Sequence, residues 1–524
     1  MKKKRNRRSI LLLLSVILLA LCLLPGCGKK DAETIASIEQ LKGSGRKIGV
    51  PADTADGRLV AELFPQAEIE YYKDEISGYT SVSQGKLDAF VYSRLAMSTA
   101  IYNGMTGVRL LDESVGEGYT CAVGLSPRTA IPDLEEKINA FLGELKADGT
   151  MDEMIGRWFE RHEETMPVIS LPKTSPLHLT VGTTGSSMPF TYYIGTELSG
   201  YDVELAYRFA AWLGSTLEFK VYDYGGIVAA AQGGDIDCIF AGLFVTPERA
   251  EALAFSQPTY IDEIAVMVRG DGASAARNEN ASAQGGGFWQ RVAASFEKTF
   301  LREDRWKLFV SGIGTTLLIT VLSIVLGTAL GFGVYLLCRG GNPVANGLAR
   351  FFVWLVQGMP VVVLLLILYY VVFGKVAISG TIVAIIGFTL VFCAAVLEML
   401  KSGVGAVDKG QTEAAYALGY SDRRAFFRVV LPQALPHFFP AYKGEITAII
   451  KATAIVGYVA VQDLTKMGDI VRSRTYEAFF PLIAVAVIYF ILAGLLTAVV
   501  NRLGARIDPR RRKAEDVLKG VSGT

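Results

Sequence analysis

The sequence has few of the side chains from which metal and catalytic centres are built. Three histidines and six cysteines occur among 524 residues, and no two cysteines form a CxxC pair. A structural zinc site needs about four such ligands at short spacing, so this composition argues against one. No nucleophile stands with a base in a recognisable catalytic motif. We therefore expect neither an enzyme nor a bound cofactor.

An excess of charge of either sign is also missing. The chain carries 52 basic and 51 acidic residues, which gives a formal net charge of +1. Nucleic-acid binding needs a basic face, so this balance argues against a nucleic-acid partner. Hydrophobic residues make up 51% of the chain and charged residues 20%, and the long apolar runs lie at its two ends. We expect a membrane protein that begins with a large soluble region.

The first 28 residues have the layout of an export signal. A basic start is followed by an apolar run from Ile10 to Leu24 and by the pair Gly26-Cys27. This ending resembles a bacterial lipoprotein signal, which implies residues 1–27 as the signal peptide and Cys27 as the acylated residue. The alternative is an uncleaved signal anchor. Both place the region after Cys27 outside the cytoplasm, at the surface of a bacterial plasma membrane.

Five apolar runs follow residue 305, each near the ~20 residues that a helix needs to cross a bilayer. They cover residues 310–338, 352–373, 378–400, 444–461 and 480–503. Lys and Arg are concentrated in 339–351, 401–443 and 504–524, which marks these segments as cytoplasmic. An exported soluble region requires an odd number of spans, so signal and loop charges agree. We assign 305–505 to a multi-pass membrane domain and 506–524 to a cytoplasmic tail.

The loop between the third and fourth runs contains a predicted short helix from Thr412 to Leu418. Glu413 suits the positive end of its dipole and Gly419 supplies the stop. Ser421 is expected to cap a second helix, which Pro432 ends. The first helix has small side chains that let another protein approach closely: Ala414, Ala415 and Ala417.

This loop resembles the EAA coupling loop of ABC-importer permeases at Glu413, Ala414, Ala415 and Gly419. Residues 357–360, 397–403 and 450–453 resemble further motifs of the polar-amino-acid permeases, so the resemblance covers all five spans. It implies docking on a cytosolic ABC ATPase, and a homodimer or a heterodimer with a related permease. The chain has no GxxxxGK[ST] phosphate loop, so the ATPase must be a separate subunit. Departures from the family pattern bear on the substrate rather than on the class: Gln357, Thr412 and Ala452.

Residues 177–270 predict an α/β fold, with strands over 177–182 and 235–241 and a helix over 201–212. They resemble the first lobe of periplasmic amino-acid-binding proteins. The resemblance implies a ligand cleft in which Arg249 is a two-pronged donor for a carboxylate. Phe190 would form an aromatic wall. The remaining hydrogen bonds to the ligand would come from Thr246, Ala241 and Gly242. Taken singly, Phe190 also fits a core position and Arg249 a surface ion pair.

Residues 34–160 resemble the second lobe and closing helices of the same family, in which this half follows the other. We therefore predict a bilobed, type II periplasmic-binding-protein-like α/β domain in circularly permuted order, followed by an all-α five-span domain. The alternative is a pair of truncated copies. Each half occurs once within 34–270, and domains with neighbouring termini tolerate permutation. Both facts favour permutation.

The second lobe departs from the family where it meets the ligand. Thr54 stands where the family binds a carboxylate, and Ser93 stands where it has an acid for the ligand's amino group. A serine cannot pair with a buried ammonium as a carboxylate does. Either the ligand lacks a free α-amino group, or Asp53 or Asp202 takes this role.

Two other features have alternative interpretations. Glu398 lies near the end of the third run with Lys401 three residues later, so it is either a functional acid in the membrane or half of a structural pair. Cys121 and Cys238 both fall on predicted strands, as buried thiols or as a disulfide.

Residues 271–304 form a predicted linker, rich in small and polar residues, and an interfacial lead-in to the first span. About 17 flexible residues span roughly 20–25 Å and hold the receptor near the membrane domain at millimolar-order concentration. We predict a subunit of an ABC importer for amino acids or related small polar solutes, with receptor and translocation path in one chain. The alternatives are a ligand-gated channel, whose pore is inserted within the receptor, and a sensor, which needs a cytoplasmic signalling domain.

Overall fold

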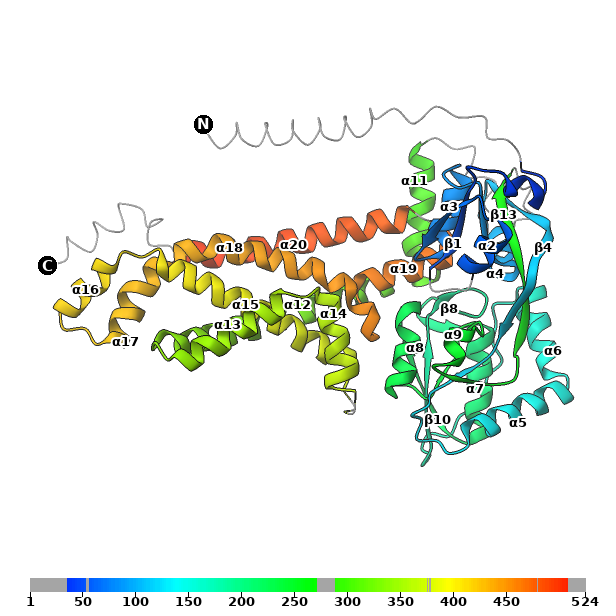
Figure 1. Cartoon of the computed structure of the whole chain (residues 1–524), viewed down its shortest axis with the longest axis horizontal. Helices are drawn as coiled ribbons and strands as arrows, with labels where there is room; N and C mark the ends of the chain where they lie inside the picture. The colour runs from blue at the N-terminus through cyan, green and yellow to red at the C-terminus, as the bar shows by residue number, and fades with distance from the viewer. Residues whose placement is uncertain are drawn as a thin grey trace.

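The computed structural model describes residues 35–52, 56–270, 288–374, 376, 378–477 and 479–507. The predicted signal peptide with Cys27, the residues Asp53 and Thr54, and residues 271–287 lie outside this part of the chain. An α/β region stands at one end of the molecule and a long helical domain, residues 306–507, extends from it (Figure 1).

The first of two α/β units, called lobe A, is built on a five-stranded sheet of order β2-β1-β3-β13-β4. β1 pairs in parallel with β2 and β3, whereas β13 is antiparallel to β3 and β4. β1 and β3 are apolar and almost entirely buried, as expected of parallel strands covered on both faces. The elements of lobe A are η1 (Ile38–Lys42), β1 (Lys47–Pro51), α2 (Asp56–Leu63), β2 (Glu68–Tyr72), α3 (Glu75–Ser83), β3 (Ala89–Ser93), α4 (Arg94–Tyr102), β4 (Val108–Cys121) and β13 (Tyr260–Arg269).

The second unit, called lobe B, has a sheet of the same pattern, β10-β6-β11-β5-β12, and a small sheet β7-β8-β9. Its strands are β5 (Gly124–Leu125), β6 (His178–Thr183), β7 (Ser186–Ser187), β8 (Thr191–Ile194), β9 (Glu197–Ser199), β10 (Thr216–Val221), β11 (Cys238–Ile239) and β12 (Ala254–Phe255). Its helices are α5 (Leu134–Ala147), α6 (Thr150–Ile155), η2 (Gly156–Glu160), α7 (Tyr201–Leu213), α8 (Tyr224–Gly233) and α9 (Pro247–Ala250).

Each half of the soluble region completes the sheet of the other. β13 comes from the second half but lies in lobe A, whereas β5 comes from the first half and lies antiparallel to β11 and β12 in lobe B. The helix α5, also from the first half, packs on α7 through Phe141 and Phe209, whose rings are 5.3 Å apart. The bilobed fold is therefore one unit built from both halves, as the permuted order predicts.

Several local predictions for the soluble region can be compared with the structure. The strand predicted over 177–182 is β6 and the helix predicted over 201–212 is α7. The strand predicted over 235–241 was too long, because β11 covers Cys238–Ile239 and Asp237 instead accepts hydrogen bonds from Thr129 and from the backbone of Thr180. Cys121 and Cys238 are free and buried, so the disulfide alternative is wrong.

Within its described residues, the helical domain contains three helices long and apolar enough to cross a membrane, or up to five spans if each of two bent pairs counts as one. The long helices are α12 (Trp306–Arg339), α15 (Gly380–Gly405) and α20 (Phe480–Ile507). One bent pair joins α13 (Pro343–Gln357) to α14 (Val361–Leu366) and η5 (Ile367–Val372) at 107°; the other joins the helix ending at Val459 to α19 (Leu464–Thr475) at 60°.

The prediction that Pro432 ends a helix was wrong. α17 (Asp422–Ala425), η6 (Phe426–Val430), α18 (Leu431–Ala452) and η7 (Thr453–Val459) follow one another without a break. Pro432 lies where the π-helical turn η6 passes into α18, and a wider turn of this kind is one of the local adjustments by which a membrane helix accommodates proline. The helix that contains the fourth apolar run therefore begins well before residue 444.

The lead-in to the helical domain is α11 (Phe288–Phe296), η3 (Glu297–Leu301) and η4 (Arg302–Asp304). Figure 1 shows α11 running across the long axis of the helical domain. A shallow hollow of about 670 Å³ lies on it, lined mostly by apolar side chains that include Trp289 and Phe296. An apolar surface of this kind suits a helix that lies in the membrane interface, and that role of the lead-in stays a prediction.

Candidate functional site

Two chain segments connect the lobes, and they lie side by side. One joins β4 to β5, and the other joins β12 to β13. The backbone N–H of Ser256 donates to the carbonyl of Val123 at 3.0 Å, and that of Thr259 donates to the carbonyl of Cys121 at 2.9 Å. Paired crossings of this kind form a hinge, about which the two lobes can open and close.

A cavity of about 270 Å³ lies between the lobes, and the helical domain forms its third wall. Lobe A contributes Pro51, Ala52, Lys73, Asp74, Glu75, Ile76 and Tyr92. Lobe B contributes Thr184, Ser186, Ser187, Asp223, Tyr224 and Gly225. The helical domain contributes Tyr458, Lys466, Asp469, Arg472 and Ser473. At about 30 Å³ for each water in the liquid, the space suits a small polar solute.

Lobe B is attached to the helical domain by apolar packing and by a buried ion pair. Ile227 and Ala230 of α8 belong to one buried apolar cluster with Leu364 and Val456 of the helical domain. Lys466 Nζ lies 2.9 Å from Asp223 Oδ1 and donates to the carbonyl of Tyr222 at 3.0 Å. Although burial opposes the effect, Lys466 and Lys73 lower the pKa of the Asp223 carboxyl.

Two glycines allow the backbones of lobe B and η7 to approach closely. A Cβ on Gly226 would lie 2.9 Å from the carbonyl oxygen of Tyr458, and one on Gly457 would lie 2.8 Å from Asp223 Oδ2. The hydroxyl of Tyr370 donates to the carbonyls of both Gly226 and Tyr458, at 3.1 and 3.3 Å. The contact between lobe B and the helical domain is therefore as tight as packing within one domain.

Lobe A meets the same helix, α19, through polar groups. Arg472 Nη2 donates to Asp74 Oδ1 and to Ser77 Oγ, both at 3.0 Å. Asp74 also caps α3 by accepting from the backbone N–H of Ser77 at 2.9 Å. Lys73 lies over the ring of Tyr458, 5.4 Å from its centroid. A single guanidinium thus connects α19 to the first turn of a lobe A helix.

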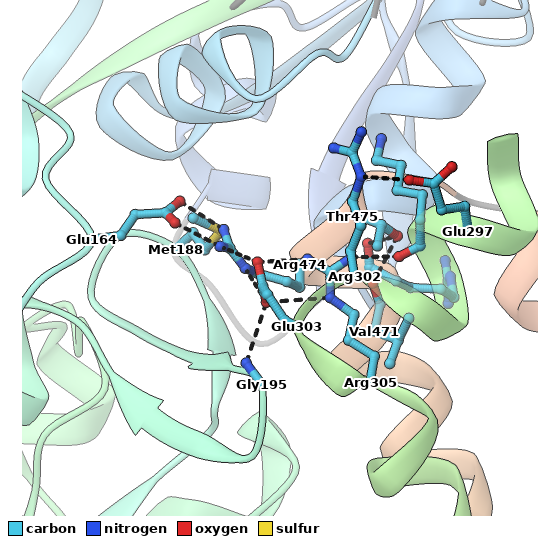
Figure 2. Close-up of polar contacts among 12 residues, drawn as sticks. Glu164, Met188, Gly195, Glu297, Arg302, Glu303, Arg305, Val471, Arg474 and Thr475 are labelled. Carbon is cyan, nitrogen blue, oxygen red and sulfur yellow. Dashed lines mark hydrogen bonds and ion pairs between the residues drawn. The ribbon is translucent and has the colours of Figure 1, made fainter. Parts of the chain in front are cut away.

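Arg474, two residues further along α19, holds the receptor by a different route (Figure 2). It binds Glu164, in the segment that joins the two halves, through two hydrogen bonds of 2.9 and 2.8 Å. It also binds Glu303 of the lead-in at 2.8 Å, which in turn accepts from the backbone N–H of Gly195 at 3.2 Å. Although burial opposes the effect, Arg474 and Arg305 lower the pKa of the Glu303 carboxyl. This ion-pair network ties α19, the lead-in and lobe B together.

The predicted ligand residues of lobe B lie behind the wall of this cavity. The Nη1 of Arg249 donates to the carbonyl of Phe244 at 2.9 Å, and its guanidinium lies 5.2 Å from the ring centroid of Tyr224, which lines the cavity. Thr246 caps α9 by accepting from the backbone N–H of Arg249 at 3.3 Å. Phe190 is buried with Phe159, whose ring centroid is 5.4 Å away, so it fits the core interpretation.

Other predicted residues are also engaged in structural contacts. The backbone N–H of Gly242, next to the buried Ala241, donates to the carboxylate of Asp202. Burial raises the pKa of Asp202 to about 7. Ser93 accepts from the backbone N–H of Ala96 at 2.9 Å and donates to Asp262. Burial raises the pKa of Asp262 to about 6. The acids that line the cavity are instead Asp74, Glu75, Asp223 and Asp469.

The predicted coupling loop lies at the end of the helical domain farthest from the lobes (Figure 1). Its helix is α16 (Lys409–Ala417), slightly earlier than predicted. Gly419 has φ +78° and donates to the carbonyl of Tyr416 at 2.9 Å, while the N–H of Tyr420 reaches the carbonyl of Ala415 at 3.0 Å. This is the Schellman stop that glycine favours. Ser421 is the N-cap residue of the next helix, α17, but its side chain makes no capping hydrogen bond.

The surface of this loop is partly apolar. Glu413 and Ala414 are exposed, whereas Ala415 is buried. Leu418 is 79% exposed and Tyr416 47% exposed, and neither was singled out by the sequence. Arg339 of α12 pairs with Asp422 at 2.6 Å, so the loop is joined to the first membrane helix. Glu398 lies 3.0 Å from Lys401, with both side chains partly exposed, which fits the structural-pair interpretation.

Comparisons with known proteins give matches to the helical domain. The family described as "Binding-protein-dependent transport system inner membrane component" matches residues 323–513. The L-cystine transport system permease protein TcyL of Bacillus subtilis is 34% identical over 34% of this chain and 79% of the relative. The arginine transport system permease protein ArtQ of the same organism is 32% identical over 36% of this chain and 87% of the relative. A crystal structure of an amino acid ABC transporter with histidines is 29% identical, covers 43% of this chain and 99% of that chain, and has a TM-score of 0.36.

Proposed function

We propose, from the premise that this chain belongs to the family of binding-protein-dependent transport inner-membrane components, that it captures a small polar solute outside the cell and conducts it across the membrane. It is thus a receptor and a permease in one polypeptide, working as a subunit of an ATP-driven importer. The solute is an amino acid or a close analogue, since the relatives are named as permeases for L-cystine, glutamine and arginine.

One observation carries this proposal: the cavity between the two hinged lobes is closed by a wall of permease side chains. A solute released from the receptor there is already at the entrance of the helical domain. The two lobes are attached unequally, since lobe B shares an apolar cluster with the permease and lobe A is joined through Arg472. We therefore expect lobe A to swing away to admit the solute while lobe B stays docked.

The energy for transport comes from a separate ATPase in this proposal. The chain has no phosphate-binding loop, so it hydrolyses no ATP itself. The exposed groups of the α16 loop form a surface that suits a groove on a cytosolic subunit. One acid, Glu413, stands beside three small or largely apolar side chains: Ala414, Tyr416 and Leu418. Because ABC ATPases work in pairs, we expect two copies of the helical domain in the assembly, or one copy with a related permease.

The test is ATP-dependent uptake by reconstituted protein. The chain is co-expressed with an ABC ATPase encoded beside it and placed in liposomes, and entry of radiolabelled L-cystine, L-glutamine and L-arginine is measured with and without enclosed ATP. We expect uptake of at least one of them that requires ATP. Glu413→Lys should abolish both co-purification of the ATPase and uptake, whereas the matched change Glu197→Lys on the exposed receptor surface should leave both intact. Equal uptake without an ATPase would refute the proposal.

A further inference from the structure

Among the described residues, part of the wall of the cleft cavity belongs to the permease rather than to the receptor. Lys466, Asp469 and Arg472 come from α19, in the extracellular segment between the fourth and fifth spans. The loop thus brings charged groups of both signs to a space that both lobes also line. A solute that fills this space meets permease side chains before it leaves the receptor.

Several buried hydrogen-bond donors at this cavity have no partner in the part of the chain that the structure describes. They include the hydroxyl of Thr184, a residue 2% exposed, and the Nε–H of Arg472. The other nitrogens of Arg472 are occupied, since Nη2 binds Asp74 and Nη1 lies 3.3 Å from Asp469 Oδ1. Native proteins rarely leave buried donors unpaired, so such donors beside a cavity point to an acceptor brought by a ligand.

Acceptors that suit a cationic group line the same cavity. Asp469 is 39% exposed and pairs with Arg472, at 3.3 Å between the charged atoms. Glu75 is half-buried and accepts from the hydroxyl of Tyr79 at 3.4 Å. Burial raises the pKa of Glu75 to about 7, and the charge of Asp74 adds to this effect. An ammonium group in the cavity would relieve the repulsion between these carboxylates.

We propose that the permease itself takes part in solute recognition: Arg472 with Thr184 binds a carboxylate of the solute, and Asp469 with Glu75 binds its ammonium group. This inference rests on the proposed function and names which residues hold the solute at the junction. The receptor's own lobes supply Thr184 and Glu75, and α19 supplies the other two. The site is therefore incomplete without the permease.

The same guanidinium then has two tasks. Its Nη2 holds Asp74 and Ser77 of lobe A, while its Nε edge faces the carboxylate. Binding of the solute orders Arg472 in the position that lobe A needs in order to close. Recognition of the solute and closure of the lobe are thus linked through one side chain of the permease.

The test measures binding to the full-length chain, purified in detergent, by calorimetry with L-cystine and with each of the twenty common amino acids. Every amino acid that binds is compared with its α-carboxamide, which keeps the ammonium group and the size but lacks the negative charge. We expect the wild-type chain to prefer the acid at least tenfold. Arg472→Gln should lose most of that preference, because a hydrogen bond between charged groups contributes about tenfold to 100-fold in affinity. Asp469→Asn should lose preference for the amino acid over its des-amino analogue.

Two further variants make the result specific. Arg474→Gln is the matched control, because Arg474 lies on the same helix but binds Glu164 and Glu303 instead of lining the cavity; it should keep the full acid preference. If Arg472→Gln does not fold, Arg472→Lys, which keeps a cation for Asp74, replaces it and should also lose acid preference. Comparing two ligands within one protein cancels differences in the folded fraction.

The outcomes separate this inference from the function on which it rests. If the wild-type chain binds neither L-cystine nor any of the twenty amino acids, the proposed function fails and the inference fails with it. If the wild-type chain binds but Arg472→Gln and Arg472→Lys keep its acid preference, the permease does not recognise the solute and the proposed function stands. Loss of acid preference in Arg249→Gln together with its retention in Arg472→Gln would place recognition in lobe B and overturn the inference.

Discussion

Removing the cation from the buried pair between Lys466 and Asp223 should detach lobe B from the permease. The side chain of Lys466 is 5% exposed and that of Asp223 is 17% exposed, with 2.9 Å between the charged atoms. Lys466→Met keeps the length of the side chain but leaves the carboxylate without its main partner. Loss of one member of a buried pair costs about 3–5 kcal/mol. The lower value corresponds to a change of about 100-fold in an equilibrium constant.

Hydrogen exchange measures this effect at the interface itself. The backbone N–H of Asp223 donates to the carbonyl of Gly457 at 3.2 Å, so its exchange reports opening between lobe B and η7. We expect its protection to fall about 100-fold in Lys466→Met. Amides in the middle of β6, far from the contact, should keep their protection and serve as the internal control.

The pH dependence of docking should change in a defined direction. In the wild type the pKa of Asp223 is lowered, so its stabilisation is complete above the ordinary Asp pKa of about 3.9 and is lost only as pH falls through the lower folded value. Docking should therefore be constant between pH 5 and 8. Without Lys466, burial favours the neutral acid, so docking of the variant should weaken as pH rises.

A second substitution separates this electrostatic explanation from a general loss of packing. When Lys466→Met is combined with Asp223→Asn, neither charge of this pair remains. We therefore expect most of the exchange protection at the amide of residue 223 to return. If the double variant is as poorly protected as Lys466→Met, or if Lys466→Met is fully protected, the ion pair does not hold lobe B and the reasoning is wrong.

Three other predictions concern separate parts of the molecule. Gly457→Ala places a Cβ 2.8 Å from Asp223 Oδ2 and should weaken docking of lobe B, which would be measured as lower exchange protection of the Asp223 amide. Gly444→Ala, with open space around its Cβ, should leave that protection unchanged. The raised pKa of Asp202, about 7, means that the folded state binds a proton more tightly than the unfolded state. The free energy of unfolding should therefore fall as pH rises from about 4 to 7. Thermal unfolding of Asp202→Asn should show a weaker fall over the same range. Leu418→Ala removes a side chain that is 79% exposed and should reduce the affinity for the ATPase at least tenfold without changing the melting temperature. The matched change Leu337→Ala, at a side chain 71% exposed on a membrane helix, should leave that affinity unchanged.

Composition was sufficient to predict the membrane segments, whereas the two-lobed organisation was implied by the resemblance to amino-acid-binding proteins. Apolar runs of membrane length identify helices because the bilayer allows few other structures. The glycine at 419 identified a helix end because few residues adopt its φ of +78°. Pro432 was misinterpreted because a π-helical turn precedes it in a continuous helix, and the sequence pattern does not indicate where such a local adjustment accommodates a proline.

The walls of the cavity were harder to predict, since they depend on which surfaces meet. Arg249 was identified from a family pattern, yet its guanidinium lies behind Tyr224. The sequence analysis did not single out Lys466 or Arg472, because nothing local indicates that α19 packs against residues nearly 400 positions earlier. A usable signal was present in the spacing of Lys466, Asp469 and Arg472, which places their side chains on neighbouring turns of one helix.

The order of the chain has a mechanical consequence for the lobe that moves. β13 ends at Arg269 in lobe A, and the next described helix begins at Phe288 beside the membrane domain. The covalent connection to the helical domain therefore starts on lobe A, the lobe that has to move in the proposed function, and not on lobe B. In that proposal, the lobe that opens is also the one that the chain joins directly to the membrane domain, so an open receptor remains attached to its permease at both lobes.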